Sequence, residues 1–360
     1  MSGRHRYKEK FLERDITPSG EIMTNSAYAP FLTSLGWSDF FASQIEPHEI
    51  GLAPKRIAEV HRARLSAITD AGPVKLTLAT YANTADFAVG DWVLADPQTN
   101  LFRRRLERRT VLQRHTEGRK ALQLAAANVD TLFIVTSCNG DFNPARLERY
   151  LALANQTGTY PVVVLTKVDA VTDATAFKQE ARGLQRDLDV VALNGRSSDA
   201  ATALSRWCGV GQTVALVGSS GVGKSTLVNT LAGLSKVQQT GDIREHDDKG
   251  RHTTTARSLH SINGGGWVID TPGMRTLHMS DAAEGIDTLF SEITNLAPRC
   301  RFRDCTHAHE PGCVVQAAVI SGALSADRLA RWRKLFEENR SNTPVQTGPH
   351  GNRSTRRKKY

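Results

Sequence analysis

The residues Gly218-Ser219-Ser220-Gly221-Val222-Gly223-Lys224-Ser225 fit the phosphate-binding pattern G-x-x-x-x-G-K-[ST]. They follow the apolar run Val214–Val217 and precede a helix predicted over Ser225–Leu231. This order of strand, loop and helix is the context in which the pattern binds phosphate. The glycines let backbone N–H groups turn toward phosphate oxygens, and the start of the helix adds its dipole. The stretch predicts a nucleotide site in an α/β domain.

Side chains at the end of this loop have separate roles. Lys224 is expected to reach the β- and γ-phosphates, and the Ser225 hydroxyl is expected to ligate Mg²⁺. Thr226, the next residue, completes the set of nucleotide-binding residues predicted for this loop.

A second motif, Asp270-Thr271-Pro272-Gly273, ends the next apolar strand, predicted over Trp267–Ile269. Asp270 would lie in the outer shell of Mg²⁺, and the Gly273 N–H would contact the γ-phosphate. The segment between the two motifs, Gly241–Arg257, is polar and charged. It suits a loop that orders around the γ-phosphate and Mg²⁺, and the alternative is a plain mobile loop.

Within that segment, His252-Thr253-Thr254-Thr255 offers groups for catalysis. One threonine would complete the magnesium shell, and we favour Thr254. Many GTPases place a water-orienting glutamine directly after the glycine of the second motif, but here Met274 follows. Intrinsic hydrolysis should therefore be slow unless another side chain positions the water. His252 is the candidate for this role, and the alternative is that it faces solvent.

A third motif, Thr166-Lys167-Val168-Asp169, ends a strand predicted over 161–165. The Asp169 carboxylate can accept two hydrogen bonds from guanine, a pattern that adenine does not offer. Lys167 would lie along the base and ribose. Asparagine is the usual first residue, so Thr166 is expected to weaken contacts that support the loop. The backbone of residues 192–194 is a candidate for a further contact with the base.

The order of the motifs is reversed, because the guanine motif lies about fifty residues before the phosphate loop. A nucleotide site is assembled in space, so this order indicates a circularly permuted GTPase. A P-loop ATPase or small-molecule kinase is the alternative that Asp169 argues against.

A cysteine-rich segment follows the α/β sequence. Cys300-x₄-Cys305-x-His307-x₅-Cys313 supplies three thiolates and an imidazole, a full tetrahedral set for structural Zn²⁺. Unligated thiols are the alternative, and His309 is a substitute ligand. Cys138 and Cys208 are expected to be ordinary buried thiols.

Composition bounds the compartment and the partners. A length of 360 residues, 40% of them hydrophobic, favours two or three domains. The formal net charge of +9 favours anionic partners such as nucleic acid, although such a charge also confers solubility. No stretch approaches the roughly 20 apolar residues of a membrane span. Five cysteines and no signal-peptide pattern favour a reduced, cytoplasmic protein without membrane attachment.

Changes in residue composition and hydrophobic pattern divide the chain into five predicted parts. They are an N-terminal extension (1–45), an OB-fold β-barrel that binds RNA (46–117), the central α/β GTPase domain (118–284), a mostly helical zinc-binding domain (285–345) and a disordered basic tail (346–360). The barrel prediction rests on alternation at Val74, Leu76 and Leu78 and on the strand Trp92–Ala95 after a turn. In the central domain, Asn143-Pro144 predicts a helix start after the apolar run 131–135.

A cationic stretch closes the β-rich part. Its basic residues are Arg103, Arg104, Arg105, Arg108, Arg109, Arg114, Arg119 and Lys120. Nucleic-acid binding is the favoured interpretation, and a solvated strand edge guarded by charge is the alternative.

This set of residues resembles the circularly permuted RsgA (YjeQ) family of ribosome small-subunit-dependent GTPases. The likeness covers about residues 50–340 and includes 123–130, Asp141-Phe142-Asn143, the three permuted motifs, 250–255 and the Cys₃His set. It implies an N-terminal OB-fold, a central permuted GTPase and a C-terminal zinc domain. It also implies late maturation of the small ribosomal subunit, with hydrolysis stimulated by that subunit, and a hydrolysis-related role for His252. The extension and the tail lie outside it.

We therefore expect a GTPase that converts GTP to GDP and phosphate and binds the small ribosomal subunit and its 16S-type rRNA. Its expected cofactors are one structural Zn²⁺ per chain and the Mg²⁺ that accompanies GTP, and its expected state is a monomer. The alternative is a nucleotide-gated RNA-binding protein in which hydrolysis is incidental.

Overall fold

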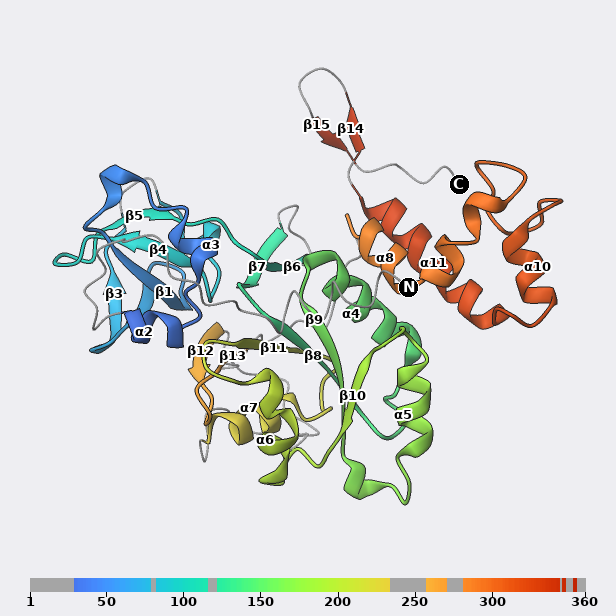
Figure 1. The fold of residues 1–360 in the computed structure, drawn as a ribbon, viewed down its shortest axis with the longest axis horizontal. Coiled ribbons are helices and arrows are strands. Elements are labelled where there is room, and N and C mark those ends of the chain that lie inside the picture. Colours follow the sequence, from blue (N-terminus) through green and yellow to red (C-terminus); the bar gives the residue numbers. More distant parts are fainter. Residues whose placement is uncertain are drawn as a thin grey trace, which may run out of the picture.

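Three parts of the chain follow one another in the fold (Figure 1). A computed structural model describes residues 29–78, 82–115, 122–233, 257–270, 281–343, 345–347 and 352–354. A β-rich part and a group of C-terminal helices lie at opposite sides of a central α/β part (Figure 1). No described helix is both long enough and apolar enough to span a membrane.

The central part is built on a mostly parallel sheet. Its strands are β8 (Thr131–Ser137), β9 (Tyr160–Thr166), β10 (Asp189–Ala192), β11 (Thr213–Val217), β12 (Arg257–Ser261) and β13 (Trp267–Asp270). They are arranged in the order β10-β9-β8-β11-β13-β12, and only β12 runs antiparallel to its neighbour β13. The strand that leads into the phosphate loop, β11, therefore lies between β8 and β13.

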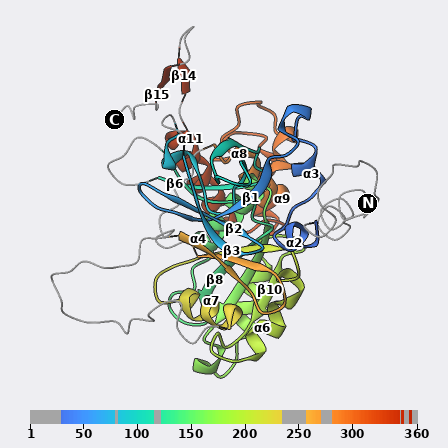
Figure 2. The same cartoon turned by 90° about the vertical axis from the view of Figure 1, so that its left-hand side faces the viewer.

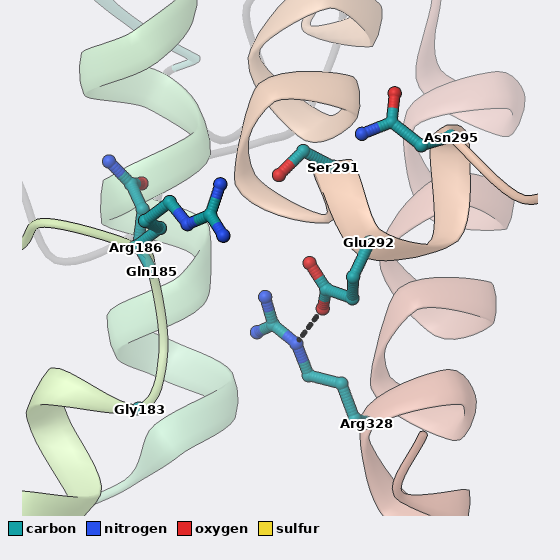
Figure 3. A pocket seen from close by; sticks show the side chains of 7 residues that line it. All are labelled: Gly183, Gln185, Arg186, Ser291, Glu292, Asn295 and Arg328. Carbon is teal, nitrogen blue, oxygen red and sulfur yellow. Dashed lines mark hydrogen bonds and ion pairs between the residues drawn. The ribbon is translucent and has the colours of Figure 1, made fainter. Parts of the chain in front are cut away.

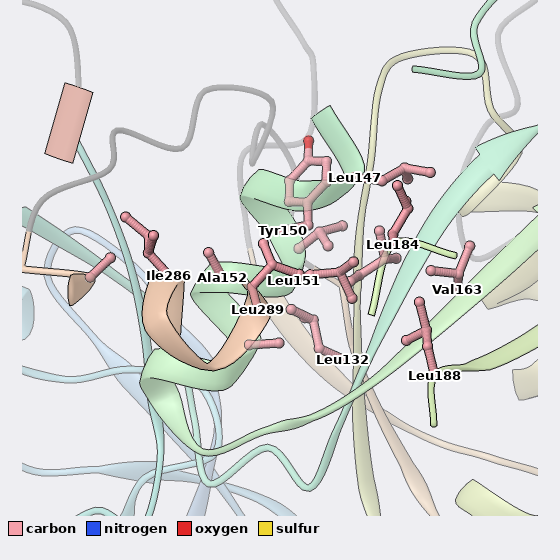
Figure 4. Close-up of a cluster of buried hydrophobic side chains, with 14 of the residues drawn as sticks. Leu132, Leu147, Tyr150, Leu151, Ala152, Val163, Leu184, Leu188, Ile286 and Leu289 are labelled. Atoms are coloured by element: carbon pink, nitrogen blue, oxygen red, sulfur yellow. The ribbon is translucent and has the colours of Figure 1, made fainter. Parts of the chain in front are cut away.

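Helices cover both faces of this sheet. They are α4 (Pro144–Thr157), α5 (Thr175–Arg182), α6 (Asp199–Leu204) and α7 (Lys224–Ala232), with short 3₁₀ turns η3 (Val168–Ala170) and η4 (Ser205–Trp207). Alternate side chains of β8 enter two different cores, as the period of a strand requires. Leu132 packs with α4 residues such as Leu151 (Figure 4), whereas Phe133 packs with Trp207 and Leu227 on the other face. Burial on both faces explains why this strand is a continuous apolar run.

The helix start predicted at Asn143-Pro144 is confirmed at α4. The Asn143 side chain accepts a hydrogen bond from the Arg146 N–H over 3.0 Å, and Pro144 occupies the first turn. The helix ends at Gly158, which adopts the left-handed conformation with φ 71°. Glycine adopts it without strain because it has no Cβ. Both ends of α4 are thus specified by local sequence.

The β-rich part closes into a ring of strands. These are β1 (Ala53–Val60), β2 (Leu65–Thr69), β3 (Gly72–Leu76), β4 (Trp92–Ala95) and β5 (Phe102–Arg105), with the 3₁₀ turn η2 (Thr84–Asp86) before β4. β1 pairs with both β2 and β4, β2 pairs with β3, and β4 pairs with β5. The ring closes where the Phe102 N–H donates to the Thr77 carbonyl oxygen over 2.8 Å.

The barrel strands and the α/β sheet are continuous. β12 pairs antiparallel with β1 through Glu59–Ser258 and Val60–Arg257, so an 11-stranded sheet runs through the described residues. Figure 2 shows β1, β2 and β3 beside the α/β strands from a second direction. A hairpin of β6 (Val111–His115) and β7 (Leu122–Ala127) connects the two parts along the chain.

The described residues of the N-terminal extension pack on the barrel. They form α2 (Ala29–Ser34) and α3 (Asp39–Ala42), and the turn η1 (Pro47–Glu49) follows them before β1. Leu32, Leu35 and Phe41 are buried against Trp92 and Leu94, so these residues belong to a shared core. The three apolar residues were not identified from the sequence because most of the extension is polar.

The C-terminal part is helical. Its elements are α8 (Ala283–Leu289), α9 (Ser291–Thr294), η5 (Ala297–Arg299), α10 (Val314–Ile320), α11 (Ala326–Asn342) and a ladder of β14 (Val345–Thr347) with β15 (Asn352–Ser354). α8 packs closely against α4 at Gly285. A Cβ on this residue would lie 2.0 Å from the Ala152 carbonyl oxygen, so the close approach requires glycine. The other residues of the predicted basic tail lie outside the described ranges.

Candidate nucleotide and zinc sites

The phosphate loop joins β11 to α7, as predicted. Gly218, Gly221 and Gly223 all have positive φ, with values of 145°, 76° and 95°. Gly218 also approaches the neighbouring strand, because a Cβ there would lie 2.1 Å from the Val135 carbonyl oxygen. A larger residue at 218 would therefore separate the loop from β8.

Lys224 folds back over the phosphate loop. Its Nζ donates to the carbonyl oxygens of Gly218, over 2.9 Å, and Ser219. Ser225 and Thr226 follow it in the first turn of α7 and are half-buried. The ammonium group thus lies at the mouth of the loop, where an anionic ligand would meet it.

The guanine motif lies beside the phosphate loop. The Thr166 hydroxyl donates to the Val222 carbonyl oxygen over 2.6 Å and lies 3.2 Å from the Thr136 carbonyl oxygen. The contact that Thr166 was expected to weaken is therefore present. Lys167 then adopts the left-handed region with φ 56° and begins η3, which contains Val168 and the exposed Asp169.

Two further predicted segments lie at the same edge of the sheet. The residues 192–194 end β10, beside β9, where the Leu193 N–H donates to the Leu165 carbonyl oxygen over 2.9 Å. Asp270 ends β13, which pairs with β11 through Ile269 and Ala215. The carboxyl ends of parallel strands meet at one edge, which is where open α/β sheets bind ligands. The reversed motifs thus converge in space.

Some predicted residues lie outside the described ranges. These are His252, Thr253, Thr254, Thr255, Gly273 and Met274. Their predicted roles in water positioning, magnesium binding and γ-phosphate contact remain predictions.

Arg146 contacts the phosphate loop, although motif reasoning had not selected it. Its Nη1 donates a hydrogen bond to the Ser219 Oγ in the phosphate loop. The sequence signal was present but indirect: a capped helix follows β8, and β8 neighbours β11 in the sheet. An arginine in the first turn of such a helix lies at the edge of the sheet where the parallel strands end and ligands bind.

The four predicted zinc ligands converge. The ligand atoms of Cys300, Cys305, His307 and Cys313 all lie within 4.8 Å of one another. The Cys300 Sγ lies 3.8 Å from the Cys313 Sγ and 3.6 Å from the His307 Nδ1, which in turn lies 3.4 Å from the Cys313 Sγ. Ordinary Zn–S and Zn–N distances in a tetrahedron separate the ligands by about 3.6–3.8 Å. The donor set and its spacing therefore fit Zn²⁺.

Contacts around the cluster hold its histidine in place. Gln316 Nε2 donates to the His307 carbonyl oxygen, and the His307 ring lies 5.5 Å from the Trp332 ring on α11. Burial lowers the pKa of His307, which favours the neutral ring that binds metal. Burial also raises the pKa of Cys138, and that of Cys208 to about 12, in agreement with ordinary buried thiols.

Ion pairs attach the C-terminal helices to α4. The buried Glu148 accepts from Arg328 over 2.6 Å and from Arg331 over 2.9 Å, and Arg149 pairs with Glu338. The α4 helix therefore contacts the phosphate loop through Arg146 and α11 through Glu148 and Arg149.

A cavity of about 260 Å³ lies between the central and C-terminal parts (Figure 3). It is lined by Gly183, Gln185, Arg186, Ser291, Glu292, Asn295 and Arg328. None of these lining residues belongs to a predicted motif, and the Arg328 Nε donates to Glu292 over 2.8 Å. The cavity is separate from the nucleotide site.

Much of the described cationic stretch is paired with carboxylates. Arg104 pairs with Glu49, Arg108 with Asp91 and Arg109 with Asp130. Arg103 is exposed, and Arg114, Arg119 and Lys120 lie where side chains are not described. The three ion pairs attach these arginines to other parts of the fold, and nucleic-acid binding by the stretch stays a prediction.

Comparisons with known proteins all indicate the same protein family. The family model described as RsgA GTPase matches residues 105–280. The small ribosomal subunit biogenesis GTPase RsgA of Mesorhizobium japonicum is 65% identical over 331 residues, covering 91% of this chain and 96% of that protein. The small ribosomal subunit biogenesis GTPase RsgA 2 of Vibrio vulnificus is 48% identical, with coverages of 86% and 88%.

Two solved structures share the fold. YjeQ from Thermotoga maritima superposes with a TM-score of 0.59 at 23% identity, covering 80% of this chain and 98% of that one. YloQ, described as a circularly permuted GTPase, gives a TM-score of 0.58 at 21% identity, with coverages of 84% and 99%. At these identities the likeness concerns the fold, and it confirms the permuted GTPase architecture.

Proposed function

The chain belongs to the RsgA GTPase family, and we propose that it hydrolyses GTP to GDP and phosphate during late maturation of the small ribosomal subunit. The observation that carries the nucleotide assignment is the hydrogen bond from Thr166 to Val222. It joins the guanine motif to the phosphate loop although the two are in reversed chain order. The subunit assignment rests on relatives whose names describe biogenesis of that subunit.

Each motif has a role in this proposal. Backbone N–H groups of residues 218–223 bind the phosphates, and Lys224 turns from its carbonyl partners to the β- and γ-phosphates. Ser225 and Thr254 would hold Mg²⁺ and Asp270 would support that site, where the metal would supply positive charge to balance that of the phosphates. Thr226 and the Gly273 N–H complete the phosphate contacts.

The base and the water are recognised by other groups. Asp169 accepts from guanine, Lys167 lies along the base and ribose, and Thr166 holds the motif, which includes Val168, against the phosphate loop. His252 positions the attacking water. The Cys₃His cluster holds one structural Zn²⁺, supported by the distances between its ligand atoms.

The domain division predicted from the sequence is part of the proposal: 1–45, 46–117, 118–284, 285–345 and 346–360. The pairing of β1 with β2 and β4, together with closure between β3 and β5, supports an OB-fold for the second unit. That unit and the zinc domain flank the GTPase and would contact the 16S-type rRNA. The protein acts as a monomer in the cytoplasm, without membrane attachment.

Turnover measured with and without purified small ribosomal subunits tests the proposal. Wild-type protein should hydrolyse GTP faster when subunits are present, and His252→Ala should lose most of that stimulation. Equal rates with and without subunits would contradict a subunit-dependent GTPase. If RNA affinity then differed between GDP and a non-hydrolysable GTP analogue, the nucleotide-gated RNA-binding alternative would be favoured.

A further inference from the structure

Arg146 brings a second cation to the phosphate loop. Its guanidinium donates to the Oγ of Ser219, whose carbonyl oxygen accepts from the Lys224 ammonium. The two cationic side chains come from different helices, α4 and α7, and meet at one residue of the loop. Convergent cations on a loop of this kind match the charge of a polyphosphate.

The position of Arg146 is specified by its helix. Asn143 caps the helix by accepting from the Arg146 N–H, and Pro144 fixes the backbone of the first turn. The preceding strand β8 pairs with β11 up to Ile134 and Val217, so the helix begins at the sheet edge where the phosphate loop lies. The Arg146 backbone is thus fixed before any ligand binds.

Arg146 also differs from its neighbours in charge pairing. Glu148 accepts from Arg328 and Arg331, and Arg149 pairs with Glu338. Within the described part of the chain, Arg146 forms no ion pair, and its side chain bonds only a neutral hydroxyl. An arginine held beside a phosphate loop without a carboxylate is suited to an anionic ligand.

We propose that Arg146 is a catalytic arginine supplied in cis, which exchanges the Ser219 hydroxyl for an oxygen of the terminal phosphate of GTP. Water attacks the γ-phosphorus, the bond to the bridging β-phosphate oxygen breaks, and GDP keeps the electron pair. The oxygen and both protons of the water end in inorganic phosphate, as H2PO4⁻, and Arg146 stays protonated while it stabilises the developing charge. The inference rests on the proposed GTPase function.

The test compares full-length variants in one set of assays. Arg146→Ala removes the charge, Arg146→Lys keeps charge without the planar fork, and Arg182→Ala is the control, because Arg182 is an exposed arginine at the end of α5. The measurements are kcat and KM for GTP with and without small subunits, the Kd for GDP, and the thermal unfolding midpoint.

Arg146→Ala should lower kcat by about 100-fold, as loss of one preorganised transition-state donor does. Arg146→Lys should retain an intermediate rate. The Kd for GDP should be unchanged, because GDP lacks the phosphate that Arg146 contacts.

Two results would overturn the inference. One is a kcat of Arg146→Ala equal to that of Arg182→Ala. The other is an equal loss of GTP and GDP affinity with a lower unfolding midpoint, which would make Arg146 a structural tether between α4 and the loop. If wild type itself hydrolyses no GTP even with subunits, the proposed function fails instead, so the two failures are distinguishable.

Discussion

The hydroxyl of Thr166 donates to the carbonyl oxygen of Val222 over 2.6 Å, across 56 residues of chain. Thr166 is 2% exposed and Val222 is 1% exposed, so the bond is shielded from water. A threonine therefore joins the guanine motif to the phosphate loop where an asparagine was expected. The geometry of one motif depends directly on the other.

Thr166→Val should lower nucleotide affinity and stability together. Valine has nearly the same shape but leaves the buried Val222 carbonyl oxygen without its donor, which costs about 1–3 kcal/mol. Calorimetric titration with GDP and thermal unfolding would measure the two losses. Thr166→Ser keeps the hydroxyl and should behave nearly as wild type. Equal affinity in Thr166→Val and wild type would show that the bond does not support the site.

Asp169→Asn should shift nucleotide preference from guanosine to xanthosine. The carboxylate is expected to accept from the two donors of guanine, whereas an amide can donate to the additional carbonyl of xanthine. Competition between GDP and XDP for a fluorescent nucleotide would measure the ratio of affinities. Unchanged selectivity would refute the assignment of this motif to the base.

The nucleotide domain was largely predictable because its signals are local. β8 and β11 are buried on both faces and appear as continuous apolar runs, and the cap and proline of α4 adjoin in sequence. The phosphate loop and the zinc ligands are short motifs with fixed spacing. Such features can be recognised from a few neighbouring residues of the sequence.

Features that depend on distant pairing were not predictable. The ion pairs of Arg104, Arg108 and Arg109 were not expected from the sequence, because their carboxylate partners lie 55, 17 and 21 residues away. The β12–β1 ladder likewise joins residues 257–258 to residues 59–60, which are far apart in the sequence. Neither a charge run nor a short polar strand specifies which partner it meets.

Removal of zinc should unfold the C-terminal helices preferentially. The metal would hold Cys300, Cys305, His307 and Cys313 together, and His307 contacts Trp332 on α11. Metal analysis should give one Zn²⁺ per chain, and a chelator should release it together with a change in Trp332 fluorescence. Cys305→Ser should bind zinc weakly, whereas Cys208→Ser leaves the cluster intact and should retain it. Full zinc content in Cys305→Ser would exclude this ligand set.

Acid should selectively weaken the attachment of η1 to the barrel. The hydrogen bond from Arg104 lowers the pKa of Glu49 to about 2. A carboxylate with a depressed pKa stabilises the fold above its ordinary pKa near 4.5, and this contribution is lost as the pH falls toward 2. Glu49→Gln should therefore lower the unfolding midpoint at pH 7 but have progressively less effect below pH 4.5. A difference independent of pH would contradict this origin.

Glu148→Gln should be the most destabilising of these changes, because Glu148 is 1% exposed and pairs with both Arg328 and Arg331. Removing one partner of a buried ion pair costs about 3–5 kcal/mol, and the loss here should fall at the lower end because Arg328 keeps its pair with Glu292. Denaturant unfolding would measure the loss. Glu337→Gln is the matched control, since its pair with Arg340 is exposed on α11 and such pairs contribute about 0–1 kcal/mol.

The same variant tests whether α11 holds α4 in position for catalysis. Because Arg146 and Glu148 share the first two turns of α4, loosening the contact with α11 should lower kcat for GTP as well as stability. The rate should be measured at a temperature where Glu148→Gln remains folded, as judged by circular dichroism. A folded variant with the wild-type kcat would mean that the α4–α11 ion pairs stabilise the fold without supporting the phosphate site.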